Sequence, residues 1–240
     1  MSASLKVAAI QFQAGIDKKN NLETAHYWID KAVQEGAQMI ALQEMFAFHG
    51  ALIHDLQAAE SIPGPTTNYL SALAAQYQIY LIGGSIPETI PDSSKIFNTC
   101  PVFAPNGELI GLYRKIHLFN IYRTQGENIS EFHTREYGQT PVSIETDLAK
   151  IGLTICYDLR FPELYRELAF AGAEIIFVPA AFLMYTGKDH WEILLRARAI
   201  ENQVFIVAPN AFGRNPETGT VVYGRSMIID PWGQVIAQCH

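Results

Sequence analysis

The chain has 240 residues, with 17 lysines and arginines against 24 aspartates and glutamates, and a formal net charge of −7 at pH 7. Proteins that bind nucleic acid or an anionic membrane use clusters of basic side chains, and this sequence has none, so both partner classes are excluded. Charged residues make up only 17% of the chain, against roughly 25% in an ordinary soluble domain, which indicates a large core and is compatible with a buried subunit interface.

The first half of the chain alternates short apolar runs with amphipathic segments. We expect strands at 7–12, 39–42, 79–82, 97–103 and 109–114, and helices at 21–35 and 66–76. Gly36 ends the first helix in a way that helices favour, and Pro105-Asn106-Gly107 predicts a hairpin between the last two strands. A polar loop is expected between the second strand and the second helix.

The second half of the chain continues the same alternation. We expect a loop at 119–140, strands at 142–144, 151–155, 175–178, 204–208 and 226–229 with a last strand ending at 237, and helices at 162–171 and 190–202. Pro162 suits the first turn of a helix. Alternating strands and helices predict an α/β fold in which helices cover the sheets. Because no linker is visible, we expect one domain over residues 1–240.

The cysteines and the apolar runs bear on the compartment. Cys100, Cys156 and Cys239 are odd in number and widely spaced, which does not resemble a disulfide framework and favours a reducing cytoplasm. No signal peptide is visible, and the longest apolar run, 175–184, is interrupted by Pro179 and is far shorter than the about 20 residues of a membrane span. Phosphate-binding, dinucleotide-binding and zinc-binding motifs are missing as well, so no cofactor or metal is expected.

Three residues follow strand-like runs and carry useful chemistry. Cys156 ends the strand at 151–155 and precedes a helix, where a thiol ionises more easily, although most cysteines are buried and inert. Glu44 and Lys115 each follow an apolar run and precede a loop. Taken alone, either one is interpreted as an ordinary surface side chain. Together the three supply a nucleophile, a proton carrier and a positive group for an oxyanion, as amide hydrolysis requires.

The segments around these residues resemble the nitrilase, or carbon–nitrogen hydrolase, superfamily. Gly152-Leu153-Thr154-Ile155-Cys156-Tyr157-Asp158-Leu159-Arg160-Phe161-Pro162-Glu163-Leu164 resembles its nucleophile motif, Tyr113-Arg114-Lys115-Ile116-His117-Leu118-Phe119 its lysine motif, and Ala41-Leu42-Gln43-Glu44-Met45 its glutamate motif. The order of the motifs agrees too, and the resemblance covers nearly the whole chain. Cys-Tyr-Asp-Leu-Arg-Phe-Pro-Glu is similar to the Nit-type branch, which includes ω-amidases and deaminated glutathione amidases.

The resemblance implies a four-layer αββα sandwich and a Glu-Lys-Cys triad. Cys156 would attack the carbonyl carbon and form a thioester, and Glu44 would act as general base and return a proton to the departing ammonia. Lys115 and the backbone N–H of Tyr157 would bind the oxyanion. The activity implied is hydrolysis of linear amides, not of peptide bonds.

The family also implies a second glutamate, seven residues before a glycine in the long loop. Glu131 stands seven residues before Gly138 and fits this position. Glu127 and Glu136 are rivals, and an exposed loop carboxylate is the alternative interpretation of Glu131.

The substrate remains open between several classes. Relatives with a cation near the nucleophile bind a substrate carboxylate, so Arg160 predicts a small amide that carries a carboxylate. The alternative for Arg160 is a structural ion pair with Asp158 or Glu163. The same triad is compatible with hydrolysis of a nitrile, an N-carbamoyl amine or an ester, and the fold is compatible with a non-catalytic scaffold.

Relatives dimerise through two helices, here those expected at 162–171 and 190–202. Both carry more apolar residues than one buried face requires, which predicts a homodimer: Leu164, Leu168, Phe170, Trp191, Ile193, Leu194, Leu195 and Ile200. The alternative is that all of this apolar surface faces a thick core within one chain. Relatives also continue past the position of Cys239 with a strand and a tail that packs on the partner. Because this sequence ends at His240, we expect either that it is a fragment or that both are absent.

Overall fold

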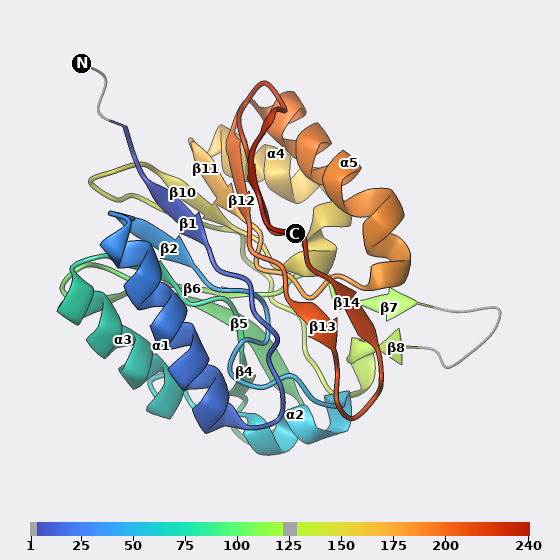
Figure 1. Ribbon diagram of the computed structural model, residues 1–240. Coiled ribbons are helices and arrows are strands. Elements are labelled where there is room, and N and C mark those ends of the chain that lie inside the picture. Colours follow the sequence, from blue (N-terminus) through green and yellow to red (C-terminus); the bar gives the residue numbers. More distant parts are fainter. Residues whose placement is uncertain (1–3, 122–128) are drawn as a thin grey trace.

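The computed structural model describes residues 4–121 and 129–240. Two six-stranded sheets lie face to face, and each has helices on its outer side (Figure 1). The layers therefore run helix, sheet, sheet, helix, which confirms the predicted αββα sandwich.

The first sheet is built from the first half of the chain. Its strands are β1 (Val7–Ala9), β2 (Met39–Ala41), β3 (Tyr80–Ile82), β5 (Ile96–Phe103) and β4 (Ile86–Thr89) in spatial order, with β6 (Leu109–Arg114) also pairing with β5. The first three strands are parallel, and β5 runs antiparallel to its neighbours β3, β4 and β6. Helices α1 (Lys18–Gln34) and α3 (Pro65–Tyr77) cover the outer face of this sheet (Figure 1).

The second sheet is built from the second half. Its strands are β16 (Val235–Gln238), β15 (Met227–Ile229), β12 (Phe205–Ala208), β11 (Ile175–Phe177), β10 (Ile151–Leu153) and β9 (Val142–Ile144) in spatial order. Helices α4 (Pro162–Phe170) and α5 (Met184–Asn202) cover it (Figure 1). Among the described residues, no helix combines the length and the apolar character needed to cross a membrane.

Strand β2 shows how the sequence builds two cores. Met39 and Ala41 belong to the larger cluster, which also takes in side chains of the second sheet, whereas Ile40 belongs to the cluster that contains residues of α1 and α3. Successive side chains of a strand point to opposite faces of a sheet, so a strand that is apolar throughout is covered on both sides. Strand β2 is therefore fixed from both faces.

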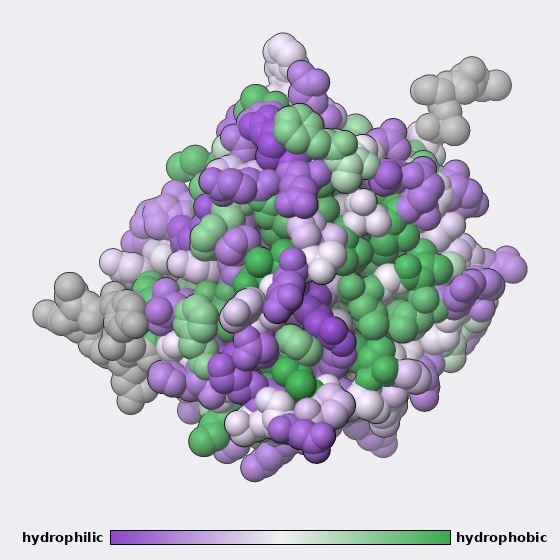
Figure 2. Space-filling view, turned by 180° about the vertical axis from the view of Figure 1, so that it is seen from behind, coloured by the Kyte–Doolittle hydropathy of each residue, from purple (hydrophilic) through white to green (hydrophobic). Residues whose placement is uncertain are grey.

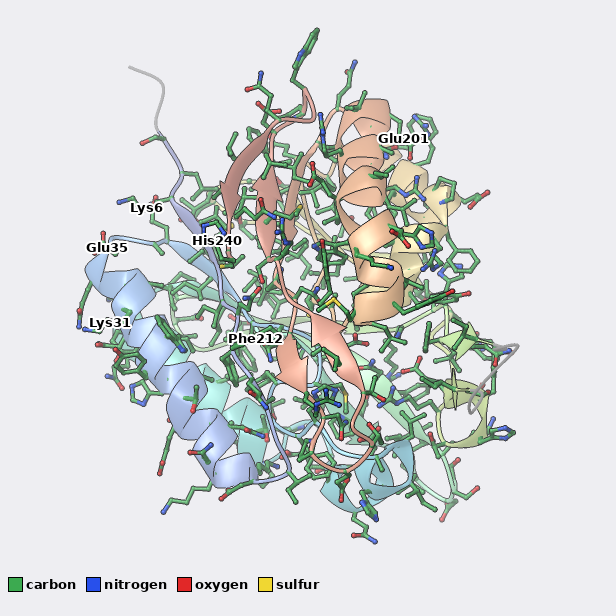
Figure 3. The ribbon with its side chains drawn as sticks, turned by 45° about the vertical axis from the view of Figure 1, so that its right-hand side comes forward. Lys6, Lys31, Glu35, Glu201, Phe212 and His240 are labelled. Carbon is green, nitrogen blue, oxygen red and sulfur yellow. The ribbon has the colours of Figure 1, made fainter. Side chains whose placement is uncertain are left out.

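The chain ends also connect layers. The Lys6 ammonium, just before β1, donates to the carbonyl oxygen of Glu35 at the end of α1 (2.5 Å; Figure 3). Gln11, just after β1, accepts hydrogen bonds from the backbone N–H and the hydroxyl of Ser226 (both 2.9 Å), just before β15. The edge strand of the first sheet is thereby tied to the second sheet.

Helix α2 (Leu52–Ala58) is the main departure from the expected elements, because its segment was expected to be a loop. Its only buried residue is Asp55, while Ile53 is 66% exposed and Leu56 is also exposed. This arrangement inverts the usual amphipathic pattern, so hydrophobic periodicity gave no signal for the helix.

Other elements also differ at their bounds. Helix α5 begins at Met184, six residues before the expected start, and includes Gly187, where an added Cβ would lie 2.5 Å from the side chain of Tyr223. The expected loop at 119–140 contains the strands β7 (Asn120–Ile121) and β8 (Ile129–Ser130) and the 3₁₀ turn η1 (Glu131–His133). A short hairpin of β13 (Phe212–Arg214) and β14 (Val221–Tyr223) was also not expected. Glycine and polar residues mark these segments as loops by composition, whereas tertiary contacts order them.

Candidate active site

A cavity of about 700 Å³ opens at the ends of the central strands. Its lining includes every side chain that the sequence singled out for chemistry: Glu44, Lys115, Glu131, Cys156, Tyr157 and Arg160. Glu44 follows β2, Lys115 follows β6, and Cys156 begins the 3₁₀ turn η2 (Cys156–Arg160) shortly after β10. Both sheets therefore contribute to one cavity, whose volume suits a small-molecule ligand.

Cys156 has an unusual backbone conformation. Its φ is +48°, in the left-handed region that residues other than glycine rarely adopt, and its N–H donates to the carbonyl oxygen of Pro179 (2.9 Å). Met45, the neighbour of Glu44, has a φ of +55°. Such conformations cluster at functional sites, where the surrounding structure maintains the strain. Here one of them occurs at Cys156 itself and the other at the residue next to Glu44.

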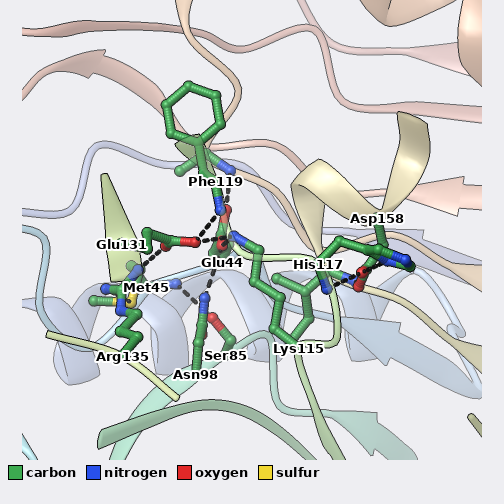
Figure 4. Close-up of polar contacts among 12 residues, drawn as sticks. Glu44, Met45, Ser85, Asn98, Lys115, His117, Phe119, Glu131, Arg135 and Asp158 are labelled. Atoms are coloured by element: carbon green, nitrogen blue, oxygen red, sulfur yellow. Dashed lines mark hydrogen bonds and ion pairs between the residues drawn. The ribbon is translucent and has the colours of Figure 1, made fainter. Parts of the chain in front are cut away.

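Glu44 is buried and has three hydrogen-bond donors. Its Oε1 accepts from Lys115 Nζ (3.0 Å) and from Asn98 Nδ2 (2.9 Å), and its Oε2 accepts from the backbone N–H of Ala181 (2.8 Å) (Figure 4). Burial by itself would raise the pKa of this carboxyl, but the Lys115 ammonium brings the pKa below its ordinary value. Glu44 is therefore ionised at neutral pH and able to accept a proton.

Lys115 is ion-paired on two sides. Its Nζ lies 3.1 Å from Glu131 Oε2, which also accepts from the backbone N–H of Phe119 (2.6 Å; Figure 4). The other Glu131 oxygen pairs with Arg135. The lysine side chain is only 1% exposed. With partners on both sides, the ammonium has a fixed position in the wall of the cavity.

The cysteine is a neutral thiol at rest. Burial raises the pKa of Cys156 well above its ordinary value, and the Glu44 carboxylate adds to this effect while Lys115 opposes it. The eased ionisation that a helix start would favour is thus outweighed by burial. A buried thiol of this kind needs a base to take its proton as it attacks.

Asp158 connects the lysine segment to the cysteine turn. Its carboxylate accepts from the Tyr113 hydroxyl (2.7 Å), from the backbone N–H of Ile155 (2.8 Å), and from the backbone N–H and ring nitrogen of His117 (3.0 and 2.7 Å; Figure 4 shows the contacts to His117). Tyr113 and His117 flank Lys115 in the chain. Sequence reasoning considered Asp158 only as an ion-pair partner for Arg160 and missed this role, although its place two residues after the nucleophile was a signal.

Arg160 has no carboxylate partner within the described parts of the chain, so the alternative of an ion pair with Asp158 or Glu163 is not observed. Its guanidinium lies over the rings of Tyr157 and Phe182, at 5.6 and 5.3 Å from their centroids, and contacts His190 Nδ1 at 3.3 and 3.4 Å. A positive group is therefore present in the cavity wall beside aromatic rings.

The rivals of Glu131 are placed differently. Glu136 lies 3.5 Å from Lys95 and does not line the cavity, and Glu127 lies outside the described residues. Glu131 itself is buried, not an exposed loop carboxylate. No group of three histidine, cysteine, aspartate or glutamate side chains with the geometry of a metal site occurs among the residues described.

Comparisons with known proteins show which sequences and folds the chain is similar to. The carbon–nitrogen hydrolase family model matches residues 6–240. The deaminated glutathione amidase of Synechocystis is 41% identical over 233 residues, 96% of this chain and 85% of that protein, and the human omega-amidase NIT2 is 39% identical over 235 residues, covering 98% and 84%. The crystal structure of Saccharomyces cerevisiae Nit3, a member of branch 10 of the nitrilase superfamily, superimposes with a TM-score of 0.88 at 34% identity, over 98% of this chain and 85% of that one.

Proposed function

The chain belongs to the carbon–nitrogen hydrolase family and cleaves amide carbon–nitrogen bonds, and we propose that its substrates are small linear amides that carry a carboxylate. Hydrolysis proceeds through a thioester on Cys156. The observation that carries this proposal is the convergence of Glu44, Lys115 and Cys156 on one cavity, with Glu44 hydrogen-bonded to Lys115 at 3.0 Å.

The first half of the reaction forms the thioester. The Glu44 carboxylate takes the thiol proton of Cys156 as the sulfur bonds to the amide carbon. The oxyanion that develops is bound by Lys115 Nζ and by the backbone N–H of Tyr157. When the tetrahedral intermediate collapses, the C–N bond breaks, Glu44 gives its proton to the nitrogen, and ammonia leaves.

The second half of the reaction uses the same groups. Glu44 takes a proton from a water molecule, whose oxygen bonds to the thioester carbon. The C–S bond breaks on collapse, the sulfur regains its proton, and the carboxylic acid product is released. Because Glu44 is ionised at rest and held by three donors, it is ready for proton transfer in both halves.

Arg160 supplies the substrate preference. Its guanidinium lines the same cavity as Cys156 and has no ion-pair partner among the described residues. A guanidinium binds a carboxylate through two parallel hydrogen bonds, which fixes orientation as well as charge. A dicarboxylic acid monoamide places its amide at one end and such a carboxylate at the other.

Product analysis tests this proposal against the competing substrate classes. Incubation with a dicarboxylic acid monoamide is expected to release ammonia without carbon dioxide, whereas an N-carbamoyl amine would release both. The matching nitrile and ester should be poor substrates. Lack of turnover on every carbon–nitrogen substrate would favour the non-catalytic scaffold.

The helices α4 and α5 support the homodimer. Of the eight apolar residues that predicted it, Leu164, Leu168, Trp191 and Leu195 are buried within the chain's own core. The others include the exposed Phe170, at 84%, with Ile193 and Ile200. Large exposed side chains of this kind mark protein interfaces, and a two-fold dimer is the commonest outcome.

Apolar side chains are also exposed outside α4 and α5, Trp232 among them. Figure 2 shows the side of the molecule opposite to Figure 1, where apolar side chains gather in patches between polar ones. Light scattering at micromolar concentration is expected to report a dimer. A monomer at every concentration would contradict the dimer without affecting the proposed chemistry.

A reducing, cytoplasmic setting is consistent with the three cysteines. Cys100 and Cys156 are buried, Cys239 is partly buried, and all three are free thiols. The mechanism needs Cys156 reduced, which such a compartment maintains.

A further inference from the structure

Beyond Glu131, a buried series of alternating charges continues to helix α2. Lys115 Nζ contacts Glu131 at 3.1 Å, the other Glu131 oxygen pairs with Arg135 Nη1, and Arg135 Nη2 pairs with Asp55 Oδ2 (Figure 4 shows the series as far as Arg135). All four side chains are at least nine-tenths buried, and all four line the cavity. The catalytic steps described above use only Lys115 of these four.

Asp55 is the one residue of α2 that is fully buried. The helix exposes Ile53 and Leu56, so the burial of large apolar side chains contributes little to its orientation. Breaking a buried ion pair on one side leaves an uncompensated charge, which costs far more than the pair contributes. A buried carboxylate in such a short helix therefore indicates a specific role for its contact with Arg135.

Resting on the proposed function, we propose that Asp55 is a positioning residue for amide hydrolysis, which holds Arg135 against Glu131 and so fixes Lys115 at the oxyanion. The first link is geometric. The planar guanidinium of Arg135 contacts Glu131 through one terminal nitrogen and Asp55 through the other, so its orientation depends on both carboxylates. If Arg135 turns away, Glu131 Oε1 loses its partner and only Oε2 is still held, by Lys115 and the backbone N–H of Phe119, so the carboxylate can rotate and shift Lys115 with it.

The second link is the local charge balance. Glu44 and Glu131 place two carboxylates around the single ammonium of Lys115, and Arg135 compensates for the surplus negative charge. An ionised Asp55 keeps Arg135 in that place. Within the described residues, Asp55 Oδ1 and Arg135 Nε have no hydrogen-bond partner, and the other side-chain contact of the guanidinium is between Nη2 and Met45 Sδ (3.6 Å).

This arrangement makes the series sensitive to pH. Burial raises the pKa of Asp55 to about 6, although Arg135 lowers it, and the carboxylates of Glu44 and Glu217 contribute in the same direction as burial. His49, near Glu44 and Arg135, has its pKa lowered chiefly by burial, an effect that Arg135 adds to and Glu44 opposes. As the pH rises through about 6, Asp55 becomes charged and its hold on Arg135 strengthens, so kcat should rise.

The variant Asp55→Asn tests the proposal through kcat, KM and pH together. It keeps the size of the side chain and removes the charge, so kcat at pH 8 is expected to fall about tenfold, with KM changed by less than about twofold, because geometry at the oxyanion affects the transition state more than substrate binding. The rise of kcat near pH 6 should disappear. The control is Glu60→Gln, a carboxylate just after α2 that pairs with Lys18 and does not line the cavity; it should leave both measurements unchanged.

A second variant distinguishes the loss of positioning from a folding defect. Replacing both members of the pair, in Asp55→Leu with Arg135→Met, removes these two buried charges together, while Glu131 keeps its contacts with Lys115 and the backbone N–H of Phe119, so folding should be preserved. This protein should show the same low kcat without the step near pH 6. Wild-type kcat with the step retained, in either variant, would overturn the proposal.

A thiol probe separates this proposal from the proposed function. If the wild-type protein hydrolyses no amide, the proposed function fails, and the rate of Cys156 alkylation by iodoacetamide then replaces kcat as the measurement. A step near pH 6 in that rate, lost in Asp55→Asn and kept in Glu60→Gln, would support the series of charges. Identical profiles in all three proteins would overturn it.

Discussion

The cavity has two walls that are built in different ways. One, the strand-end wall, consists of Glu44, Lys115 and Cys156, which follow strands buried between layers. The other, the loop wall, consists of residues 49–55, including the start of α2, and residues 215–222 of the hairpin of β13 and β14.

The contacts within the loop wall are few and polar. Glu217 accepts from the backbone N–H of Ala51 (2.6 Å) and contacts His54 Nδ1 (2.8 Å), and Asn215 Nδ2 donates to the carbonyl oxygen of Gly50 (2.8 Å). The strand-end wall is fixed by the packing of two sheets, whereas the loop wall is fixed by charges and single hydrogen bonds. The proposed chemistry therefore resides on the rigid wall, whereas the loop wall contributes Asp55 and, through it, the proposed pH response.

The largest effect is expected when the proposed nucleophile in the strand-end wall is replaced. Cys156→Ala should reduce kcat on the order of 10⁴-fold or more, because no other group can form the acyl-enzyme. Steady-state ammonia release measures this loss. Cys100→Ala and Cys239→Ala are the matched controls and should stay close to wild type, since neither cysteine lines the cavity. Normal turnover in Cys156→Ala would rule out the mechanism.

The next largest effect is expected when the charged residues beside the nucleophile are replaced. Lys115→Ala should lower kcat by about 10²- to 10³-fold, because the oxyanion loses a buried positive partner. Lys115→Arg should not restore it, since a planar guanidinium places its donors differently. Glu44→Gln should slow both formation and hydrolysis of the acyl-enzyme, measured by rapid quench. A normal kcat in either single variant would remove that residue from the triad.

A smaller effect tests whether Arg160 selects the substrate. Arg160→Ala should raise KM for a carboxylate-bearing amide by about tenfold or more, in line with the loss of a charged, two-pronged hydrogen bond. A neutral amide of similar length serves as the control substrate, and its KM should change little. Equal changes for both substrates would indicate that Arg160 acts only in packing against Tyr157 and Phe182.

The smallest effect concerns the stability of the loop wall. The backbone N–H of Ala51, together with His54, lowers the pKa of Glu217, so its contribution to stability is present above its ordinary pKa of 4.5 and is lost as the pH falls below it. Glu217→Gln should therefore lower Tm slightly, on the order of 1 °C, at pH 7, because exposed pairs contribute little. As the pH falls through the lowered pKa of Glu217, the variant and the wild type should converge in calorimetry. A constant difference at all pH values would contradict this account of the contact.

The strand-end wall was largely predictable from sequence, and the loop wall was not. Apolar runs that end at Leu42, Arg114 and Ile155 located the strands, and the residues that follow them identified the chemistry. The loop wall was not predictable because it depends on contacts between segments that are distant in the sequence. Arg135 and Asp55 are separated by 80 positions, and α2 lacks an apolar buried face, so no local pattern connects them.

Some features of the strand-end wall were hidden as well. Asn98 holds Glu44 from the middle of β5, where a polar residue in a strand gave no signal of its partner. The left-handed backbone at Cys156 also cannot be read from a cysteine, because the fold imposes it against the preference of the residue.

The most direct test of the central claim is the covalent intermediate itself. The wild-type protein is mixed with a dicarboxylic acid monoamide, quenched in acid after milliseconds to seconds, digested and analysed by mass spectrometry. The peptide containing Cys156 should gain the mass of the acyl group, in an amount that matches the first turnover of ammonia, and Cys156→Ala should show no such gain. Ammonia release with no acyl group on Cys156 at any time, or with the group on Cys100 or Cys239, would contradict the account.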